Sequence, residues 1–373
     1  MQDTSAAVSR PAVYRSIQTS RGLAATFVLL FHLGIAIGEP NYFHYPIFDI
    51  PFAFGEAGVE FFFVLSGFII LTAHRDDLFQ PRKVGSYLRK RLIRIYPTYW
   101  IIFLGVFFGA LMIPSLRHTV PHDFVRVLEA LSLMPLDPAV VGGMGAPVLG
   151  VAWTLQYEMC FYLFFATLIL SRVLALIAAA LGIYVYFQYA GETSGPFILR
   201  FLAEDYVLVF FMGMAAAVLH YSNRAQVLSP RFYLTAGIAL FSIVALDVTF
   251  ELRHIRNWWT ILYGVACTMI VLGLVAAEDK GRAFGGGKWM QLLGGASYAL
   301  YLIHFPLISV LCKFAIALGL GEMGVTGAFI TFVAMFVICI AAAMIFHVVI
   351  ERPLANWLRR KVREKPAKEM ATV

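Results

Sequence analysis

Long apolar stretches recur along the whole chain and are separated by short polar segments. A helix that crosses a membrane needs about 20 mainly apolar residues, and ten stretches reach or approach this length. The pattern therefore predicts an all-α, polytopic membrane bundle of about ten transmembrane helices. The expected spans are Gly22 to Gly38, Gly58 to Ala73, Ile95 to Ile113, Trp153 to Leu170, Val173 to Tyr189, Tyr206 to His220, Phe232 to Phe250, Trp258 to Ala277, Ser297 to Leu318 and Gly324 to Ile350.

The polar segments suggest how the spans are joined. Only Ser171 and Arg172 separate the fourth span from the fifth, and two spans with a tight turn fit the length better than one long helix. The longest connection, Pro114 to Ala152, is rich in Pro and Gly, which favours irregular backbone. We expect residues 1–20 to form an N-terminal segment, residues 21–353 the membrane domain and residues 354–373 a basic tail that frays.

Composition and charge agree with a membrane protein. Of the 373 residues, 60% are hydrophobic and only 14% are charged, which excludes a soluble enzyme of this size. The net charge is +7. With the N-terminus inside, the inner segments hold 23 of the Lys and Arg residues and the outer loops hold five. This asymmetry predicts an even number of spans with both termini in the cytoplasm, and it explains the basic charge by contact with membrane lipids rather than nucleic acid. The four cysteines have no metal-site or disulfide spacing.

Ionisable side chains inside the spans are the first candidates for function, because each costs about 2.5–3.5 kcal/mol on insertion scales. Two of them, Asp247 and His347, lie nearer span ends, where we expect structural roles. The remaining candidates are His32, Glu60, Glu158 and His304.

Arg21 and His32 lie on one face of the first expected helix. They are eleven residues apart, so they differ by about 20° around the axis and by roughly 16 Å along it. A guanidinium binds phosphate well, and an imidazole is a good general base near neutral pH. A ligand with a phosphate head and a long arm, such as coenzyme A, would reach both. Arg21 alone also fits a simple anchor at the inner membrane surface.

Glu158 lies five residues after Trp153 at the outer end of its span. It can therefore approach the depth of His32 from the opposite side. A carboxylate beside an imidazole orients the ring and stabilises its protonated form. A protonated glutamate that satisfies neighbouring backbone groups is an equally good interpretation.

Other polar residues support weaker predictions. Ser66 and Gly67 are small enough to let helices approach closely, which is the expected role of Gly67. Glu60 lies near the outer end of its span, where an exposed carboxylate costs little. His304 precedes Pro306, so it either belongs to a site or satisfies backbone that the proline frees.

Arg91 and Arg94 are the members of a basic cluster that lie nearest the membrane. They are three residues apart and share a helix face. Most of this cluster fits topological anchoring, but these two are the best phosphate-binding candidates after Arg21.

At these motifs the chain resembles the acyltransferase-3 family of bacterial membrane O-acyltransferases. The motifs occur in order and cover nearly the whole chain. They are Arg21 to His32, Gly58-Val59-Glu60-Phe61-Phe62-Phe63 with Ser66-Gly67-Phe68, Arg91-Leu92-Ile93-Arg94-Ile95-Tyr96-Pro97, Trp153-Thr154-Leu155 with Glu158, Tyr298 to His304 with Pro306, and Glu351-Arg352-Pro353.

The resemblance implies a multi-pass protein of the bacterial cytoplasmic (inner) membrane. It implies an acyl-CoA donor, most often acetyl-CoA, and a hydroxyl acceptor on a cell-surface or secreted glycan or a lipid-linked saccharide. His32 would be catalytic, Arg21 would contact the donor, and Glu158 would support catalysis. Arg91 and Arg94 would face the donor side. Because about twenty residues follow Pro353, we expect the minimal form without an esterase-like domain.

The sequence thus predicts an O-acyltransferase with His32 as general base. Transfer is either direct or passes through a covalent intermediate. Ser66 is a candidate for the residue that would carry this intermediate. The alternative is a transporter or flippase that uses the buried His and Glu residues for proton or substrate handling. A non-catalytic membrane partner of a glycan assembly machine is a third possibility.

Overall fold

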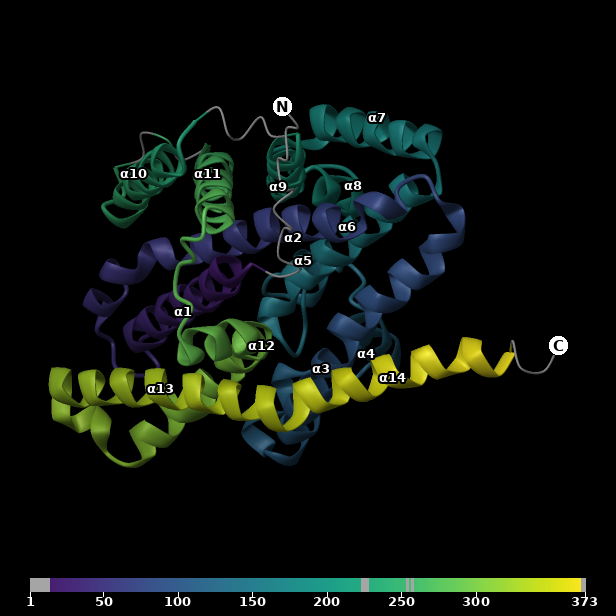
Figure 1. The fold of residues 1–373 in the computed structure, drawn as a ribbon. Helices are drawn as coiled ribbons and strands as arrows, with labels where there is room; N and C mark the ends of the chain where they lie inside the picture. The colour runs from purple at the N-terminus through teal and green to yellow at the C-terminus, as the bar shows by residue number, and fades with distance from the viewer. Residues whose placement is uncertain (1–13, 223–227, 253–254, 256–257, 370–373) are drawn as a thin grey trace.

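A computed structural model describes residues 14–222, 228–252, 255 and 258–369, with backbone alone for 115 and 362–369. This part of the chain is helical and contains no β-strand (Figure 1). Ten segments are long and apolar enough to cross a membrane, which confirms the predicted fold class. Their helices are α1 (Arg15–Gly38), α2 (Gly58–His74), α3 (Val84–Met112), α6 (Trp153–Leu170), α7 (Arg172–Tyr189), α9 (Tyr206–Tyr221), α10 (Pro230–Thr249), α11 (Trp259–Asp279), α12 (Lys288–Ala317) and α13 (Gly324–Phe346).

The predicted break between the fourth and fifth spans is confirmed. Ser171 has an extended backbone between α6 and α7, and its Oγ accepts a hydrogen bond from the Val173 amide. This contact satisfies one of the free N–H groups at the start of α7. The two spans are therefore separate helices joined at a single residue.

The connection after α3 is more ordered than its Pro and Gly content predicts. Its glycines Gly142, Gly143 and Gly145 do adopt positive φ, as irregular backbone requires. Asp123 and Asp137, however, each accept a hydrogen bond from an amide two residues later and so begin two short helices. The connection holds η5 (Pro114–Thr119), α4 (Phe124–Leu131), α5 (Pro138–Val141) and η6 (Gly150–Ala152).

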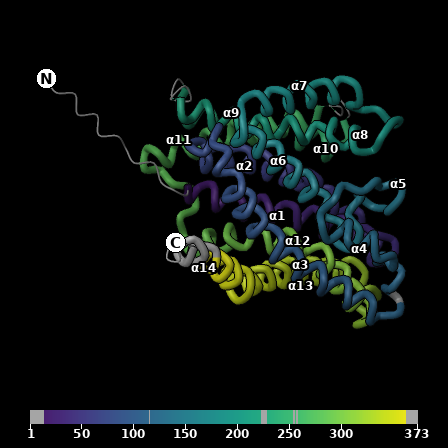
Figure 2. The backbone as a smooth tube through the Cα atoms, turned by 90° about the vertical axis from the view of Figure 1, so that its right-hand side faces the viewer, coloured from purple at the N-terminus to yellow at the C-terminus, as the bar shows by residue number. Residues whose placement is uncertain are grey.

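Where the structure describes the basic tail, as far as residue 369, it is helical after Pro353, contrary to expectation. A π-helical turn, η10 (His347–Glu351), connects α13 to α14 (Arg352–Glu369). Pro353 lies just after the π-helical turn in a helical stretch that runs without a break from α13 into α14, so its missing N–H leaves one gap in the helical hydrogen bonds there. In Figure 2, α14 runs toward the side on which α1 begins, as an even number of crossings requires.

The remaining short elements cover the ends of the long helices. On one side, η1 (Pro46–Phe48) and η2 (Ile50–Ala57) link α1 to α2, and η9 (Leu320–Met323) links α12 to α13. On the other side, η3 (Arg75–Asp77) and η4 (Pro81–Lys83) link α2 to α3. The helix α8 (Phe197–Leu202) precedes α9.

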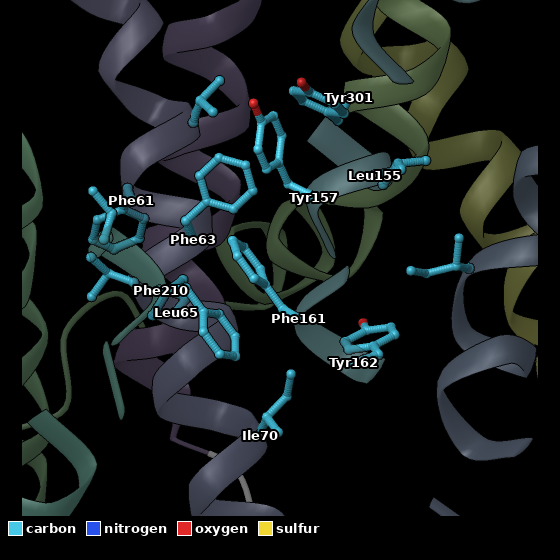
Figure 3. Packing of buried hydrophobic residues seen from close by; sticks show 14 of the residues in the cluster. Phe61, Phe63, Leu65, Ile70, Leu155, Tyr157, Phe161, Tyr162, Phe210 and Tyr301 are labelled. Atoms are coloured by element: carbon cyan, nitrogen blue, oxygen red, sulfur yellow. The ribbon is translucent and has the colours of Figure 1, made fainter. Parts of the chain in front are cut away.

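Two central packing arrangements position the interior of the bundle. α1 packs against α12, and α2 packs against α9 and α11, while α7 lies at an edge (Figure 1). Aromatic rings fill the contact between α2, α6 and α9 (Figure 3). Phe63 lies edge-on to Phe161, with ring centroids 5.5 Å apart, and Phe161 stacks on Phe210 at 4.2 Å. These rings form a wall beside a group of polar residues in the interior of the bundle.

Candidate active site

A cavity lies among α1, α2, α3, α6 and α12. Its empty volume, counted out to the open mouth and including open solvent, is about 790 Å³. Five predicted residues from four helices meet there. Its polar lining consists of Arg21, Ser66, Arg91, Arg94, Thr154, Glu158, Tyr162, Ser297, Tyr298 and Tyr301.

The three arginines of the cavity outnumber the one carboxylate of its lining, Glu158. Arg21 makes one weak side-chain hydrogen bond, from Nη1 to Gln18 Oε1 at 3.3 Å. The Arg91 guanidinium lies 5.7 Å from the ring centroids of Tyr87 and Tyr162, and its buried Nε has no hydrogen-bond partner. Among the described residues, none of the three forms an ion pair with a carboxylate. Such a cluster fits an anionic ligand such as a phosphate group.

Glu158 is held by two hydroxyl groups inside the cavity. Tyr162, one turn later on α6, donates a short hydrogen bond to Glu158 Oε1. Ser66 Oγ from α2 lies 3.5 Å from the same oxygen. The carboxylate is therefore fixed within the cavity and shares its lining with the arginines.

The predicted pairing of Glu158 with His32 is wrong. His32 does not line the cavity, and its Nδ1 lies 2.9 Å from the Val28 carbonyl oxygen and 3.2 Å from His304 Nε2. The reason is the packing of α1, which places this face of the helix against α12 instead of α6.

The two histidines lie just beyond one wall of the cavity. Tyr301 lines the cavity, and its ring centroid is 5.9 Å from that of His304. The His304 ring centroid is in turn 4.9 Å from that of His32. The Tyr301 hydroxyl donates to the Val151 carbonyl at 3.1 Å and lies 3.0 Å from Thr154 Oγ1, which fixes this ring. One aromatic ring thus separates the cationic cavity from the histidine pair.

Comparison with known proteins identifies the family of this chain. The model of the acyltransferase-3 family, described as "Acyltransferase domain", matches residues 14–347. The chain belongs to this family. It is therefore a multi-pass membrane acyltransferase, as the motifs predicted.

Several relatives of this acyltransferase carry named activities. The chain is 31% identical to the exopolysaccharide production protein ExoZ of Rhizobium meliloti over 81% of this chain and 90% of that protein. It is 26% identical to the acyltransferase MdmB of Streptomyces mycarofaciens over 85% of both chains. It is 23% identical to the O-acetyltransferase OatA of Staphylococcus aureus over 68% of this chain and 46% of OatA. No solved structure matches the chain significantly.

Three of the predicted site residues lie outside the cavity. Besides His32 and His304, Glu60 faces away from it toward α11, where Thr260 provides a hydrogen bond. Glu60 was expected near an exposed outer end, but it is only 5% exposed because η2 covers that end of α2. One of its carboxylate oxygens has no hydrogen-bond partner.

His304 and the two residues expected to be structural have defined contacts. His304 Nδ1 lies 2.9 Å from the Leu300 carbonyl oxygen, which is two residues before the Leu302 carbonyl that Pro306 frees. Asp247 accepts a hydrogen bond from Trp259 Nε1 at 3.0 Å. His347 Nδ1 lies 2.6 Å from Glu351 Oε2 within the π-helical turn.

Five polar residues of the cavity were not predicted. Tyr162 could have been found, because it lies four residues after Glu158 on the same helix face. Ser297 is fully buried and its Oγ has no hydrogen-bond partner, while the Tyr298 hydroxyl donates to the Ile95 carbonyl at 3.0 Å. The motif from Tyr298 to His304 already contained Tyr298 and Tyr301, but hydropathy could not show which of its side chains face the cavity.

Proposed function

We propose that this protein transfers a short acyl group, in the first place acetyl, from cytoplasmic acyl-CoA to a hydroxyl of a cell-surface or secreted glycan. The single observation that carries the proposal is the cavity whose lining holds three arginines and one carboxylate. The names of ExoZ and OatA support a saccharide acceptor and an acetyl group, respectively. The site of action would be the cytoplasmic membrane of a bacterium.

Acetyl-CoA would bind with its phosphates on Arg21, Arg91 and Arg94. Arginine suits this task because its planar donors match phosphate oxygens and keep their charge. The apolar part of the lining, including Phe62 and Ile69, would contact the uncharged arm of the donor. The thioester would then point toward Tyr301 and the histidine pair.

His32 would act as the general base. It removes the proton of the acceptor hydroxyl, and the oxygen attacks the thioester carbonyl carbon. The carbon–sulfur bond breaks, and His32 returns the proton to the coenzyme A thiolate. Glu158 would support this site by fixing Tyr162 and Ser66, since it does not contact His32. In the alternative route through a covalent intermediate, Ser66 would be the nucleophile.

The His32→Ala variant provides the test. Removal of a general base usually costs about 10²-fold to 10⁴-fold in rate, so we expect loss of glycan acylation while the protein still inserts into the membrane. Mass spectrometry of surface glycans from a deletion strain, complemented with each form, measures this as the mass of one acyl group. The matched control is His122→Ala, which changes an exposed histidine in the outer connection.

Two results would contradict the proposal. One is normal glycan acylation in the His32→Ala strain. The other is movement of solute by purified protein in vesicles without transfer of label from radioactive acetyl-CoA, which would indicate a transporter. Loss of transfer in Ser66→Ala as well as His32→Ala, with label trapped on wild-type protein, would favour the covalent route.

A further inference from the structure

We propose that His304 is a positioning residue that fixes the tautomer of His32 and presents His32 Nε2 to the acceptor hydroxyl. The inference rests on the proposed function, in which His32 is the base. It assigns to a neutral histidine the orienting role that was predicted for Glu158.

The contacts of His304 determine which of its nitrogens carries hydrogen. The side chain is fully buried. Its Nδ1 lies 2.9 Å from the Leu300 carbonyl oxygen, and a carbonyl oxygen can only accept, so Nδ1 is the donor. In the neutral ring the other nitrogen, Nε2, is then an acceptor. This acceptor lies 3.2 Å from His32 Nδ1.

The Val28 carbonyl leads to the same assignment without reference to the tautomer of His304. His32 Nδ1 faces two acceptors, His304 Nε2 and the Val28 carbonyl oxygen at 2.9 Å. Nδ1 must therefore carry the hydrogen, and Nε2 has the free lone pair. Within the described residues no hydrogen bond occupies His32 Nε2. The rings of Phe31 and Phe305, with centroids 5.1 Å and 5.4 Å away, hold the imidazole edge-on.

This arrangement suits a base inside a membrane. When His32 Nε2 takes the hydroxyl proton, the resulting imidazolium keeps Nδ1–H directed at two lone pairs. His304 keeps its own proton throughout, and the proton on His32 Nε2 leaves with the coenzyme A thiolate. In hydrolase triads a carboxylate performs the orienting task, but a neutral ring performs it without adding a buried charge.

The fold places the two histidines at one depth. α1 and α12 approach so closely at Gly22 and Gly294 that a Cβ on Gly22 would lie 2.9 Å from the Gly294 amide nitrogen. Each histidine follows its glycine by ten residues, or about 15 Å along the helix axis. Because the two helices cross the bundle in the same direction, this contact brings the imidazoles level.

Two substitutions with similar polarity separate positioning from packing. In His304→Gln, the carboxamide reaches the place of Nε2 and can accept from His32 Nδ1. In His304→Asn, the shorter amide can replace only the contact to Leu300. We expect Asn to lower kcat by about 10-fold to 100-fold with the KM for acetyl-CoA within about twofold, and Gln to retain kcat within about fivefold. The control His220→Asn removes another buried histidine and should change kcat by less than about twofold.

The assay uses purified protein in vesicles, radioactive acetyl-CoA and a glycan fraction isolated from the deletion strain. Equal losses in the Gln and Asn variants, no loss in Asn, or a change confined to KM would overturn the inference. Absence of label transfer by the wild type, or full transfer by His32→Ala, would instead overturn the proposed function. Nitrogen-15 NMR of histidine-labelled wild-type protein tests the tautomer without any change at His304. A signal for His32 with hydrogen on Nε2, assigned by its loss in His32→Ala, contradicts the inference.

Discussion

At the scale of single residues, the cavity is unusual for its charge. Arginine inside a membrane protein is costly unless it is paired or reaches water, yet Arg21, Arg91 and Arg94 gather around one carboxylate, Glu158. Arg94 is the most exposed of the three, so it is accessible to a ligand that enters from the mouth. The excess of positive charge explains how the site would attract a polyphosphate.

The Arg94→Ala variant should therefore bind the donor weakly. A hydrogen bond to a charged group contributes about 1.5–3 kcal/mol, which corresponds to roughly 10-fold to 100-fold in affinity. We expect the KM for acetyl-CoA to rise by about tenfold or more, with a smaller change in kcat. The control is Arg89→Ala on the same helix, which is exposed and does not line the cavity. Equal effects of the two variants on KM would show that Arg94 acts only through the general surface charge.

Residue type and spacing located five residues of the cavity but not their partners. Helical geometry gives the angle and rise between side chains of one helix. It does not give the rotation of the neighbouring helices, so nothing in the sequence decided whether His32 faces α6 or α12. Hence Glu158 was predicted beside His32, while the ring that contacts His32 belongs to His304.

At the scale of helices, close backbone contact holds the central pair α2 and α9 together. A Cβ on Gly67 would collide with the Phe210 carbonyl oxygen and lie 2.9 Å from the Met214 amide nitrogen. Gly213 is placed in the same way against the Val64 carbonyl. The close-packing role predicted for Gly67 is thus confirmed, and it fixes Ser66 beside Glu158.

The Gly67→Ala variant should be less stable because backbone atoms cannot move aside as side chains do. Overpacking of this kind costs about 1–3 kcal/mol, which would appear as a lower Tm in detergent. Gly105→Ala in α3 is the matched control, since a Cβ there meets nothing within 4 Å and alanine is the better helix former. An unchanged Tm for Gly67→Ala would mean that α2 and α9 separate easily.

Hydropathy predicted all ten spanning helices, and it failed where a helix continues beyond the lipid. A chain in lipid must satisfy its backbone internally, so apolar length alone indicates a helix. α3 begins about three turns before its expected start, and α14 continues after α13. Both extensions are rich in Arg and Lys, which are good helix formers. A hydropathy pattern detects only apolar stretches, so it does not include these charged residues in a predicted helix.

At the scale of the whole molecule, the helices divide into a core and a lipid-facing shell. In the span that contains α2, 67% of the most apolar 18-residue stretch is buried inside the protein. In α7, only 6% of the corresponding stretch is buried. Both segments read as apolar spans in the sequence, so hydropathy could not tell which one borders the site. The difference arises because α2 lies among α1, α6, α9 and α11, whereas α7 contacts α6 and α8 at an edge.

The orientation of the bundle in the membrane can be tested by labelling cysteines from either side. The positive-inside asymmetry predicts that the N-terminus is in the cytoplasm, and three spans separate the loop after α7 from the loop after α11. A cysteine at position 192, from Glu192→Cys, should therefore react with a membrane-impermeant maleimide in intact cells. A cysteine from Lys280→Cys should react only after permeabilisation. Both positions are exposed, so access to the reagent is decided by the side of the membrane.

The four native cysteines define the background of this experiment. Cys267, Cys312 and Cys339 are fully buried and Cys160 is half-buried, so the unmodified protein should label weakly in both conditions. The reverse pattern would place the arginine cavity, through α1 and the start of α3, toward the outside. Acyl-CoA from the cytoplasm would then have no entry to Arg21 and Arg94. The labelling experiment therefore defines the topology, and it also tests whether the donor can reach its proposed site.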